Sequence, residues 1–414
     1  MKSRKILESS VDLLHPAMAS GSLHLRSHPV SRGKTADNLV PVTPGGRPRR
    51  LAKKHKSPRR NELAFLMNRT WIIPLLLILA FLLLFALNTS ESNIVHPFIF
   101  LSYKIENTTD SSAPLEYGKG PRDIAFVIFY TIVLFFTREF IMHELLRPLA
   151  ISLGITSRSK QVRFNDQMYV AVFTSVIGPL GLYVMYQTPT WYFSTAGMYA
   201  GYPHKTHSGL TKFYYLLQAA FWVQQALVMI LGLEERRRDF KELVVHHVVT
   251  VALIALSYRF HFTMMGVLVY VTHDISDFFL ATSKTLNYLD SPLQGPYFTL
   301  CILIWVYLRH YINLRILFSI LTEFRTIGPY ILDWEAEQYK CEISNVITFA
   351  LLAVLQALNL FWLYCLLRNA YRFVVLGVAK DDREEGEEDE KEREAVNNEV
   401  TGGEKYVSLR VRDH

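Results

Sequence analysis

Cysteine is scarce in this sequence, with three residues in 414. The three stand far apart, which excludes a disulfide framework and a zinc site of the usual spacing. The chain also lacks a glycine-rich phosphate loop, a serine in a nucleophile elbow and a Cys-x-x-Cys pair. P-loop nucleotide chemistry, elbow-type serine hydrolysis and dithiol redox chemistry are therefore not expected. We interpret the cysteines as apolar fillers at Cys301, Cys341 and Cys365.

Hydrophobic residues, in contrast, make up 50% of the chain, and its mean hydropathy is +0.15 despite long polar ends. A membrane-spanning helix needs about 20 apolar residues, and stretches of that kind recur throughout. The pattern predicts an all-α polytopic membrane protein with about eight transmembrane helices. We expect these spans at Trp71–Asn88, 124–144, 168–187, 213–232, 243–259, 262–284, 297–321 and 346–370.

The polar ends and loops predict the topology. Residues 1–70 form a disordered basic segment, which the positive-inside rule places in the cytosol. The first span, within 71–89, follows too long a polar segment to be a cleaved signal peptide. Residues 90–122 are then a lumenal loop, in which Asn107 begins a glycosylation sequon. An even number of spans returns the disordered acidic tail, residues 376–414, to the cytosol.

The basic run before the first span allows two interpretations. Arg47 to Arg60 holds eight basic residues, a density that also occurs in nucleic-acid-binding patches. Because a membrane span begins eleven residues after Arg60, we expect contact with anionic membrane lipids and no nucleic-acid partner.

Two polar clusters interrupt the apolar runs. His246 and His247 lie in one predicted span, and His273, Asp274 and Asp277 lie in the next. An aspartate at the centre of a membrane helix costs roughly 2.5–3.5 kcal/mol. From the helical rise, the histidine pair lies about 6–9 Å below the cytosolic surface, Asp277 about 10 Å and His273 about 16 Å. The clusters are therefore expected to meet in the cytosolic half of the membrane.

The second cluster belongs to a polar stripe on its helix. At 100° per residue, the stripe is about 40° wide, which predicts that it faces a bundle interior or a cavity. His273 and Asp277 are one turn apart, and we expect them to form a hydrogen bond. The stripe holds Gly266, His273, Asp277 and Lys284, with Tyr270 and Asp274 beside it.

Other spans carry polar side chains that need partners. Arg309 lies near the middle of its span and needs an anion, for which Asp274 or Asp277 would serve. Gln224 lies in a span with two further glutamines, Gln218 and Gln225, that can form hydrogen bonds across helices.

Three kinds of role suit this set of residues. Histidines and carboxylates can bind a metal, but the HxxxH and HxxHH boxes of membrane hydroxylases are missing, so no metal is expected. Histidine with carboxylate also suits acid–base or nucleophilic acyl transfer, in which a carboxylate orients the imidazole and stabilises its cation. A third possibility is that the polar residues only hold helices together. Convergence of the whole set at one depth favours acyl transfer.

Six runs of residues in and around the two clusters form a recognisable pattern. They are Asp239-Phe240-Lys241-Glu242, His246-His247-Val248-Val249-Thr250, His273-Asp274-Ile275-Ser276-Asp277-Phe278-Phe279, Lys212-Phe213-Tyr214-Tyr215, Phe221-Trp222-Val223-Gln224-Gln225, and Tyr307 to Arg315. The pattern resembles the longevity-assurance motif of ceramide synthases, proteins with a TLC domain, and the last run resembles the fungal branch of that family. No homeobox-like segment of the kind found in many animal members is present.

The resemblance implies an enzyme of the endoplasmic reticulum that transfers a fatty acyl group from acyl-CoA to the amine of a sphingoid base, such as dihydrosphingosine or phytosphingosine. It implies a six-helix barrel-like core within residues 123–375, preceded by one or two extra spans. No cofactor is expected, since acyl-CoA is a co-substrate. The implied catalytic residues are His246, His247, His273, Asp274 and Asp277. From charge and position in the predicted spans, we expect the substrate-binding residues to be Arg309, Tyr270, Gln224, Arg236 and Arg237.

The resemblance leaves the mechanism open. Either a histidine takes the proton of the attacking amine, or His246 is acylated first, with His247 and Asp277 in support. Fungal members imply very long acyl chains and a small single-span accessory subunit, and a homo- or heterodimer is possible. The rival hypothesis is a non-enzymatic lipid carrier or sensor with the same fold.

Overall fold

The computed structural model describes residues 69–105, 115–234 and 237–376, all of which belong to one compact unit. The predictions for the basic N-terminal segment up to residue 68, for the sequon at Asn107, for Arg236 and for the acidic tail from residue 377 lie outside the described residues.

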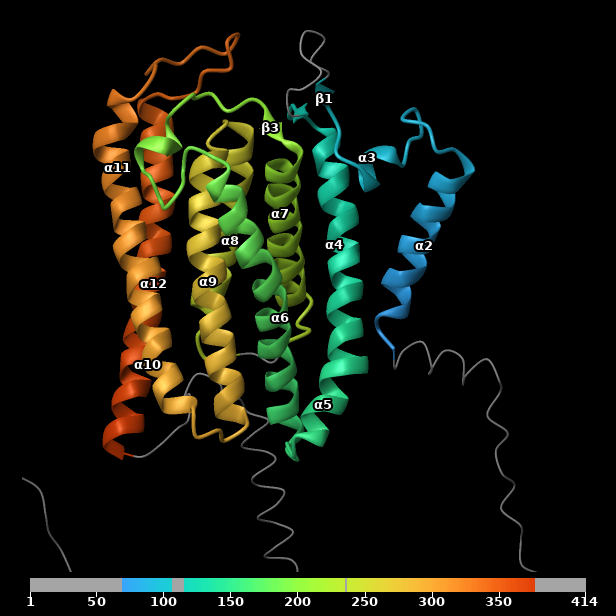
Figure 1. Cartoon of the computed structure of the whole chain (residues 1–414), viewed down its shortest axis with the longest axis vertical. Helices are drawn as coiled ribbons and strands as arrows, with labels where there is room; N and C mark the ends of the chain where they lie inside the picture. Colours follow the sequence, from blue (N-terminus) through green and yellow to red (C-terminus); the bar gives the residue numbers. More distant parts are fainter. Residues whose placement is uncertain (1–68, 106–114, 235–236, 377–414) are drawn as a thin grey trace, which may run out of the picture. The chain divides into compact units, whose positions relative to one another are not determined.

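Most of the described chain is helical, as predicted, and the main helices alternate in direction along the sequence (Figure 1). Within the described residues, seven helical segments are long and apolar enough to cross a membrane. An additional apolar helix, α2, precedes them and is shorter. The main helices are α2 (Ile72–Leu87), α4 (Arg122–Phe140), α6 (Arg158–Tyr186), α7 (Gly209–Ile230), α8 (Phe240–Arg259), α9 (Thr263–Tyr288), α10 (Gln294–Trp305), α11 (Asn313–Thr326) and α12 (Glu342–Leu376).

Two of these segments contain π-helical turns. The π-helix η1 (Ile141–Leu146) links α4 to α5 (Arg147–Ser152), and η3 (Val306–Ile312) links α10 to α11. With η3 included, the segment from Gln294 to Thr326 is one span of 33 residues. A π-helical turn holds an extra residue and often marks a functional site, and η3 carries Arg309.

Most helices extend beyond the spans that hydropathy predicts. The span expected at 168–187 is Arg158–Tyr186, and the one expected at 346–370 is Glu342–Leu376. Hydropathy detects only the apolar part of a helix, whereas the hydrogen-bonded backbone continues into the polar interface. Each of the eight predicted spans corresponds to an apolar helix in the predicted order, and seven of these helices are long enough to cross a membrane.

We call the end of the bundle with the connections after α6, α8 and α11 the upper face. The opposite lower face carries the connections after α5, α7 and α9 (Figure 1). At the upper face β1 (Lys104–Ile105), β2 (Glu116–Tyr117) and β3 (His207–Ser208) form a small antiparallel sheet in that order. The other short elements are α3 (His96–Ile99) and η2 (Ala196–Met198).

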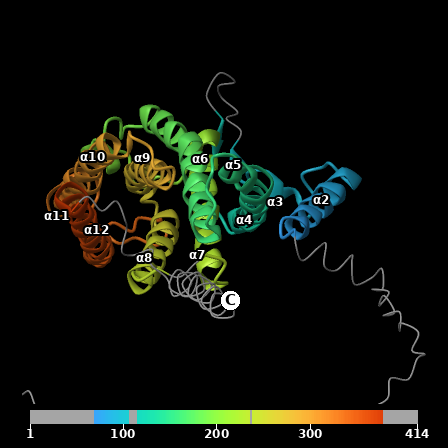
Figure 2. The ribbon, with the colours of Figure 1, turned by 90° about the horizontal axis from the view of Figure 1, so that it is seen from below.

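Six spans form a closed ring. Around it, α6 contacts α9, the α10–α11 span follows, and α12, α8 and α7 lead back to α6. Figure 2 shows this ring from below, with α4 and α2 outside it. Helix α4 packs on α7, and α2 packs on α4. This arrangement agrees with the predicted six-helix core preceded by two extra helices.

A buried ion pair joins α4 to the ring at the upper face. Lys212 Nζ lies 2.7 Å from Asp123 Oδ1, and both side chains are buried. The lysine also donates hydrogen bonds to the backbone oxygens of Ser102 and Gly118, and the Tyr258 hydroxyl donates to Asp123 Oδ2 at 2.7 Å. Because each charge is paired and further hydrogen-bonded, this pair fixes the upper end of α7 against α4 and α8.

Candidate active site

The two histidine clusters converge inside the ring. His246 and His247 lie on the second turn of α8, and both are buried. The ring centroid of His246 lies 5.5 Å from Trp222 of α7 and 5.2 Å from Trp362 of α12. Two tryptophans therefore pack edge-to-face against this imidazole.

A polar cavity of about 230 Å³ opens beside them, toward the lower face. Its inner wall carries four predicted catalytic residues together with Arg309. Charged residues of both signs surround its outer part, near the lower ends of α6, α7 and α9. The inner residues are His246, His247, Asp274, Asp277 and Arg309, and the outer ones are Arg163, Asp166, Glu234, Arg237 and Lys284.

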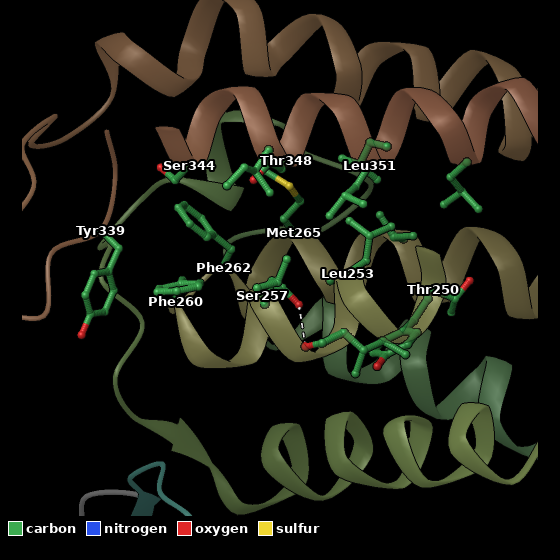
Figure 3. A pocket seen from close by; sticks show the side chains of 18 of the residues that line it. Thr250, Leu253, Ser257, Phe260, Phe262, Met265, Tyr339, Ser344, Thr348 and Leu351 are labelled. Atoms are coloured by element: carbon green, nitrogen blue, oxygen red, sulfur yellow. Dashed lines mark hydrogen bonds between the residues drawn. The ribbon is translucent and has the colours of Figure 1, made fainter. Parts of the chain in front are cut away.

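A second cavity, of about 200 Å³ and almost wholly apolar, lies in the upper half of the bundle. It separates α12 from α8 and α9. In Figure 3, Thr250, Leu253 and Ser257 line one side, and Ser344, Thr348 and Leu351 line the other. Phe260, Phe262, Trp334 and Tyr339 line its upper end.

The two cavities are neighbours at the predicted catalytic cluster, where they share a wall. Trp222 lines both, and the consecutive residues His273 and Asp274 line the apolar and the polar cavity respectively. The polar stripe of α9 lines both cavities. Gly266 and Tyr270 line the apolar cavity, and Asp277 and Lys284 line the polar cavity. The prediction that this stripe faces an interior cavity is confirmed.

Arg309 is paired within the ring, as its depth required. Its Nη2 lies 2.5 Å from Asp277 Oδ1, its Nε donates to Ser276 Oγ at 2.6 Å and its Nη1 donates to Asn359 Oδ1 at 3.1 Å. The guanidinium also lies 4.3 Å from the ring centroid of Trp305. This network joins α9, η3 and α12, so Asp277 rather than Asp274 is the partner of Arg309.

The expected hydrogen bond between His273 and Asp277 is not formed. His273 Nδ1 lies 2.8 Å from the backbone oxygen of Val269, one turn earlier on α9. Since a carbonyl oxygen only accepts, Nδ1 carries the proton and Nε2 carries the lone pair. Asp277 faces Arg309 instead, because an arginine offers a charge-assisted bond that a neutral imidazole cannot match.

The predicted substrate-binding residues do not all lie in one cavity. Tyr270 lines the apolar cavity, and Arg309 and Arg237 line the polar one. Arg237 also forms two hydrogen bonds to the carboxylate of Asp239, at 3.0 and 2.9 Å. Gln224 is fully buried and lines neither cavity, whereas its neighbour Gln225 lines the polar one.

Several residues of the site were not predicted as site residues from the sequence. Trp222 and Trp362 pack against His246, and Asn359 accepts from Arg309. Tyr214 and Gln218 donate to Asp274. Asn359 and Gln356 are the two amides in the middle of a predicted span, which was a usable signal. Tyr214 and Trp222 lie within the runs that carry the family resemblance.

Among the described residues, no group of three or more His, Cys, Asp or Glu side chains is placed to hold a metal ion. The site is instead a cluster of three imidazoles, one carboxylate bonded to neutral donors and one carboxylate paired with arginine.

Comparisons with known proteins identify the family of this chain. The TLC domain family matches residues 163–368, which run from α6 into α12. The sphingosine N-acyltransferase-like protein FUM17 of Gibberella moniliformis is 54% identical over 346 residues, which cover 82% of this chain and 89% of that protein. Ceramide synthase LAG1 of Saccharomyces cerevisiae is 47% identical over 78% of both chains. Sphingosine N-acyltransferase lac1 of Schizosaccharomyces pombe is 43% identical over 85% of this chain and 90% of that protein. The chain therefore belongs to the fungal branch of the longevity-assurance family of ceramide synthases, the TLC-domain family that its sequence resembles.

Proposed function

We propose that this protein is a ceramide synthase, which transfers a fatty acyl group from acyl-CoA to the amine of a sphingoid base. The observation that carries the proposal is that a polar and an apolar cavity share a wall at a cluster of histidines. An acyl-CoA has the same division, since its CoA part is a large polyanion and its acyl part a hydrocarbon. Its thioester, the bond that must react, lies at the boundary between them.

The charges around the polar cavity suit the CoA part. Arg163, Arg237 and Lys284 lie in its outer part, where cations raise the local concentration of an anionic substrate. The acyl chain then extends into the apolar cavity, where each buried methylene contributes about 0.8 kcal/mol. This placement brings the thioester carbon beside Trp222 and the imidazoles. No cofactor takes part in the proposed reaction.

The proposed reaction has two halves. A ring nitrogen of His246 attacks the thioester carbonyl, the C–S bond breaks, and CoA leaves as a thiol with the proton from the other ring nitrogen. The amine of the sphingoid base then attacks the acyl-imidazole, which forms the amide and returns one amine proton to the imidazole. The buried position of His246, with two tryptophans packed against it, supports the first half, because water would hydrolyse an acyl-imidazole.

Other residues would support this reaction. The lone pair of His273 Nε2 is in a buried position with no partner among the described residues, and His273 lines the apolar cavity. His247 lines the polar cavity beside His246, their ring centroids 5.7 Å apart. Asp277 supports the site through Arg309, which it neutralises, rather than through an imidazole.

The test is an assay of the purified chain with dihydrosphingosine or phytosphingosine and acyl-CoAs of graded length, with products measured by mass spectrometry. We expect ceramide, with a preference for very long acyl chains, and the same rate after strong chelation of metals. A lipid carrier would bind the base and leave acyl-CoA intact, and that result would overturn the proposal.

We further propose the endoplasmic reticulum as the location, with both termini in the cytosol and the upper face in the lumen. A glycan at Asn107 would mark that side, so Asn107→Gln should increase gel mobility, and unchanged mobility would contradict the glycosylated loop. We also propose a small single-span accessory subunit and assembly into homo- or heterodimers, on the basis of the family resemblance. Purification in mild detergent followed by mass measurement would detect either.

A further inference from the structure

The two aspartates of the site have different kinds of partner. Asp277 pairs with the guanidinium of Arg309. Asp274, three residues earlier on α9, accepts hydrogen bonds from the Tyr214 hydroxyl at 3.1 Å and from the Gln218 side-chain amide. Both of these donors are uncharged, so Asp274 is held in place by neutral hydrogen bonds, whereas Asp277 is held by a cation.

The two donors to Asp274 are neighbours on α7 and are hydrogen-bonded to each other. Tyr214 and Gln218 are one helical turn apart, and both are fully buried. Gln218 Nε2 also donates to the Tyr214 hydroxyl at 3.3 Å. Since the hydroxyl oxygen accepts a hydrogen bond from Gln218, the hydroxyl donates its own hydrogen to Asp274. Both bonds to the carboxylate end on Oδ2, which leaves Oδ1 for a group in the polar cavity.

Gly181 of α6 makes room for this arrangement. A Cβ at Gly181 would overlap the Tyr214 hydroxyl oxygen and would lie 2.9 Å from Val271 Cγ2. An alanine there would push the tyrosine away from Asp274. Because glycine within a helix costs about 1 kcal/mol relative to alanine, its presence at this position is explained by the close approach of Tyr214.

We propose that Asp274 binds the ammonium group of the sphingoid base, and that Tyr214, Gln218 and Gly181 are positioning residues for it. A sphingoid base is a cation near neutral pH, and only its neutral amine can attack an acyl carbon. In the proposed step one N–H bond of the ammonium breaks and its proton passes to Asp274 Oδ1, which leaves the neutral amine beside His246. Asp277 is less suited to this role, because Arg309 already balances its charge.

This inference rests on the proposed function, and kinetics with both substrates separate the two. In a two-step reaction, kcat/KM for acyl-CoA reports the first transfer and kcat/KM for the base reports the second. We expect Tyr214→Phe and Gln218→Met each to lower kcat/KM for dihydrosphingosine at least tenfold and to leave kcat/KM for acyl-CoA within twofold. Gly181→Ala should have the effect of Tyr214→Phe, and the double variant should be no worse than Tyr214→Phe alone, because both changes break the same hydrogen bond.

Tyr169→Phe is the matched control. Tyr169 is a buried tyrosine of α6 that lines neither cavity, and its hydroxyl has no partner among the described residues. Equal values for Tyr214→Phe and Tyr169→Phe would overturn the inference, as would equal losses for both substrates. If Tyr214→Phe does not fold, Gln218→Met decides by the same criteria. Failure of the wild-type chain to make ceramide would count against the proposed function instead.

Discussion

Arg309 and Asp277 form an ion pair inside the helical ring, with 2.5 Å between Nη2 and Oδ1. The arginine comes from the π-helix η3 and the aspartate from α9, and Asn359 of α12 binds the same guanidinium. Three spans of the ring are thus joined at the depth of the proposed reaction. The lower half of the bundle contains this polar network and the polar cavity, whereas the upper half encloses an apolar cavity.

Replacing Arg309 with methionine should destabilise the protein strongly. Loss of one partner of a buried pair typically costs about 3–5 kcal/mol, because the other charge stays buried and unpaired. Arg309→Lys should not restore stability, since one ammonium cannot reach Ser276, Asn359 and Asp277 together. Thermal unfolding in detergent measures the effect. Arg315→Met, which removes an exposed arginine from α11, is the control, and an equal shift in both variants would contradict the account.

Substitutions in the apolar cavity should shorten the acyl chain that the protein accepts. Thr348 and Ser344 line the cavity one turn apart on α12, and Thr348 is the nearer to the histidines. One turn is about 5.4 Å, the length of roughly four methylene groups. Thr348→Phe should therefore shift the preferred acyl length downward by about that number relative to Ser344→Phe. Val346→Phe, at a position 56% exposed and outside the cavity, should leave the preference unchanged. An equal preference in all three variants would exclude this cavity as the acyl site.

Lys119 should make stability depend on pH at the upper face. Burial, together with nearby Lys212, lowers the pKa of Lys119 to about 7, although Asp123 and Glu337 act in the opposite direction. The unfolded chain keeps the ordinary lysine pKa near 10.5 and therefore binds more protons between about pH 7 and pH 10. Stability consequently rises with pH in that window.

The variant Lys119→Met isolates this contribution from other groups. We expect its unfolding midpoint to exceed that of the wild type by about 2 °C or more at pH 6.5, and the gap to narrow steadily as the pH rises toward 10. Burial also lowers the pKa of Lys340, to about 8, but that residue is present in both proteins and its effect cancels in the difference. A gap that does not change with pH would contradict the account.

Much of this architecture was predictable because membrane helices are long and apolar. Hydropathy identified every span, and the cost of burying His246, His273 and Asp274 directed attention to the site. The helical periodicity of α9 correctly placed Gly266, His273, Asp277 and Lys284 along the cavities. These features follow from one helix at a time, so the sequence was sufficient.

Contacts between helices were harder to predict from the sequence. Asp274 and Asp277 lie close on the same helix, so periodicity could not decide which one Arg309 binds. The choice depends on Tyr214 and Gln218 of α7, which donate hydrogen bonds to Asp274 Oδ2. It also depends on Asn359 of α12, which accepts a hydrogen bond from the arginine. Similarly, Gln224 and Gln225 differ by 100° on α7, and only the packing of the ring shows that the second faces the cavity.

The central claim is that an acyl group passes through His246 where the two cavities share a wall. Its most direct test mixes the purified protein with acyl-CoA in the absence of a sphingoid base. We measure released CoA and the intact mass of the protein, for the wild type and for His246→Ala. The account predicts a rapid release of about one CoA per protein and a mass increase of one acyl group, both absent in the variant. A wild-type chain that turns over normally with base present but shows neither signal without it would contradict the claim.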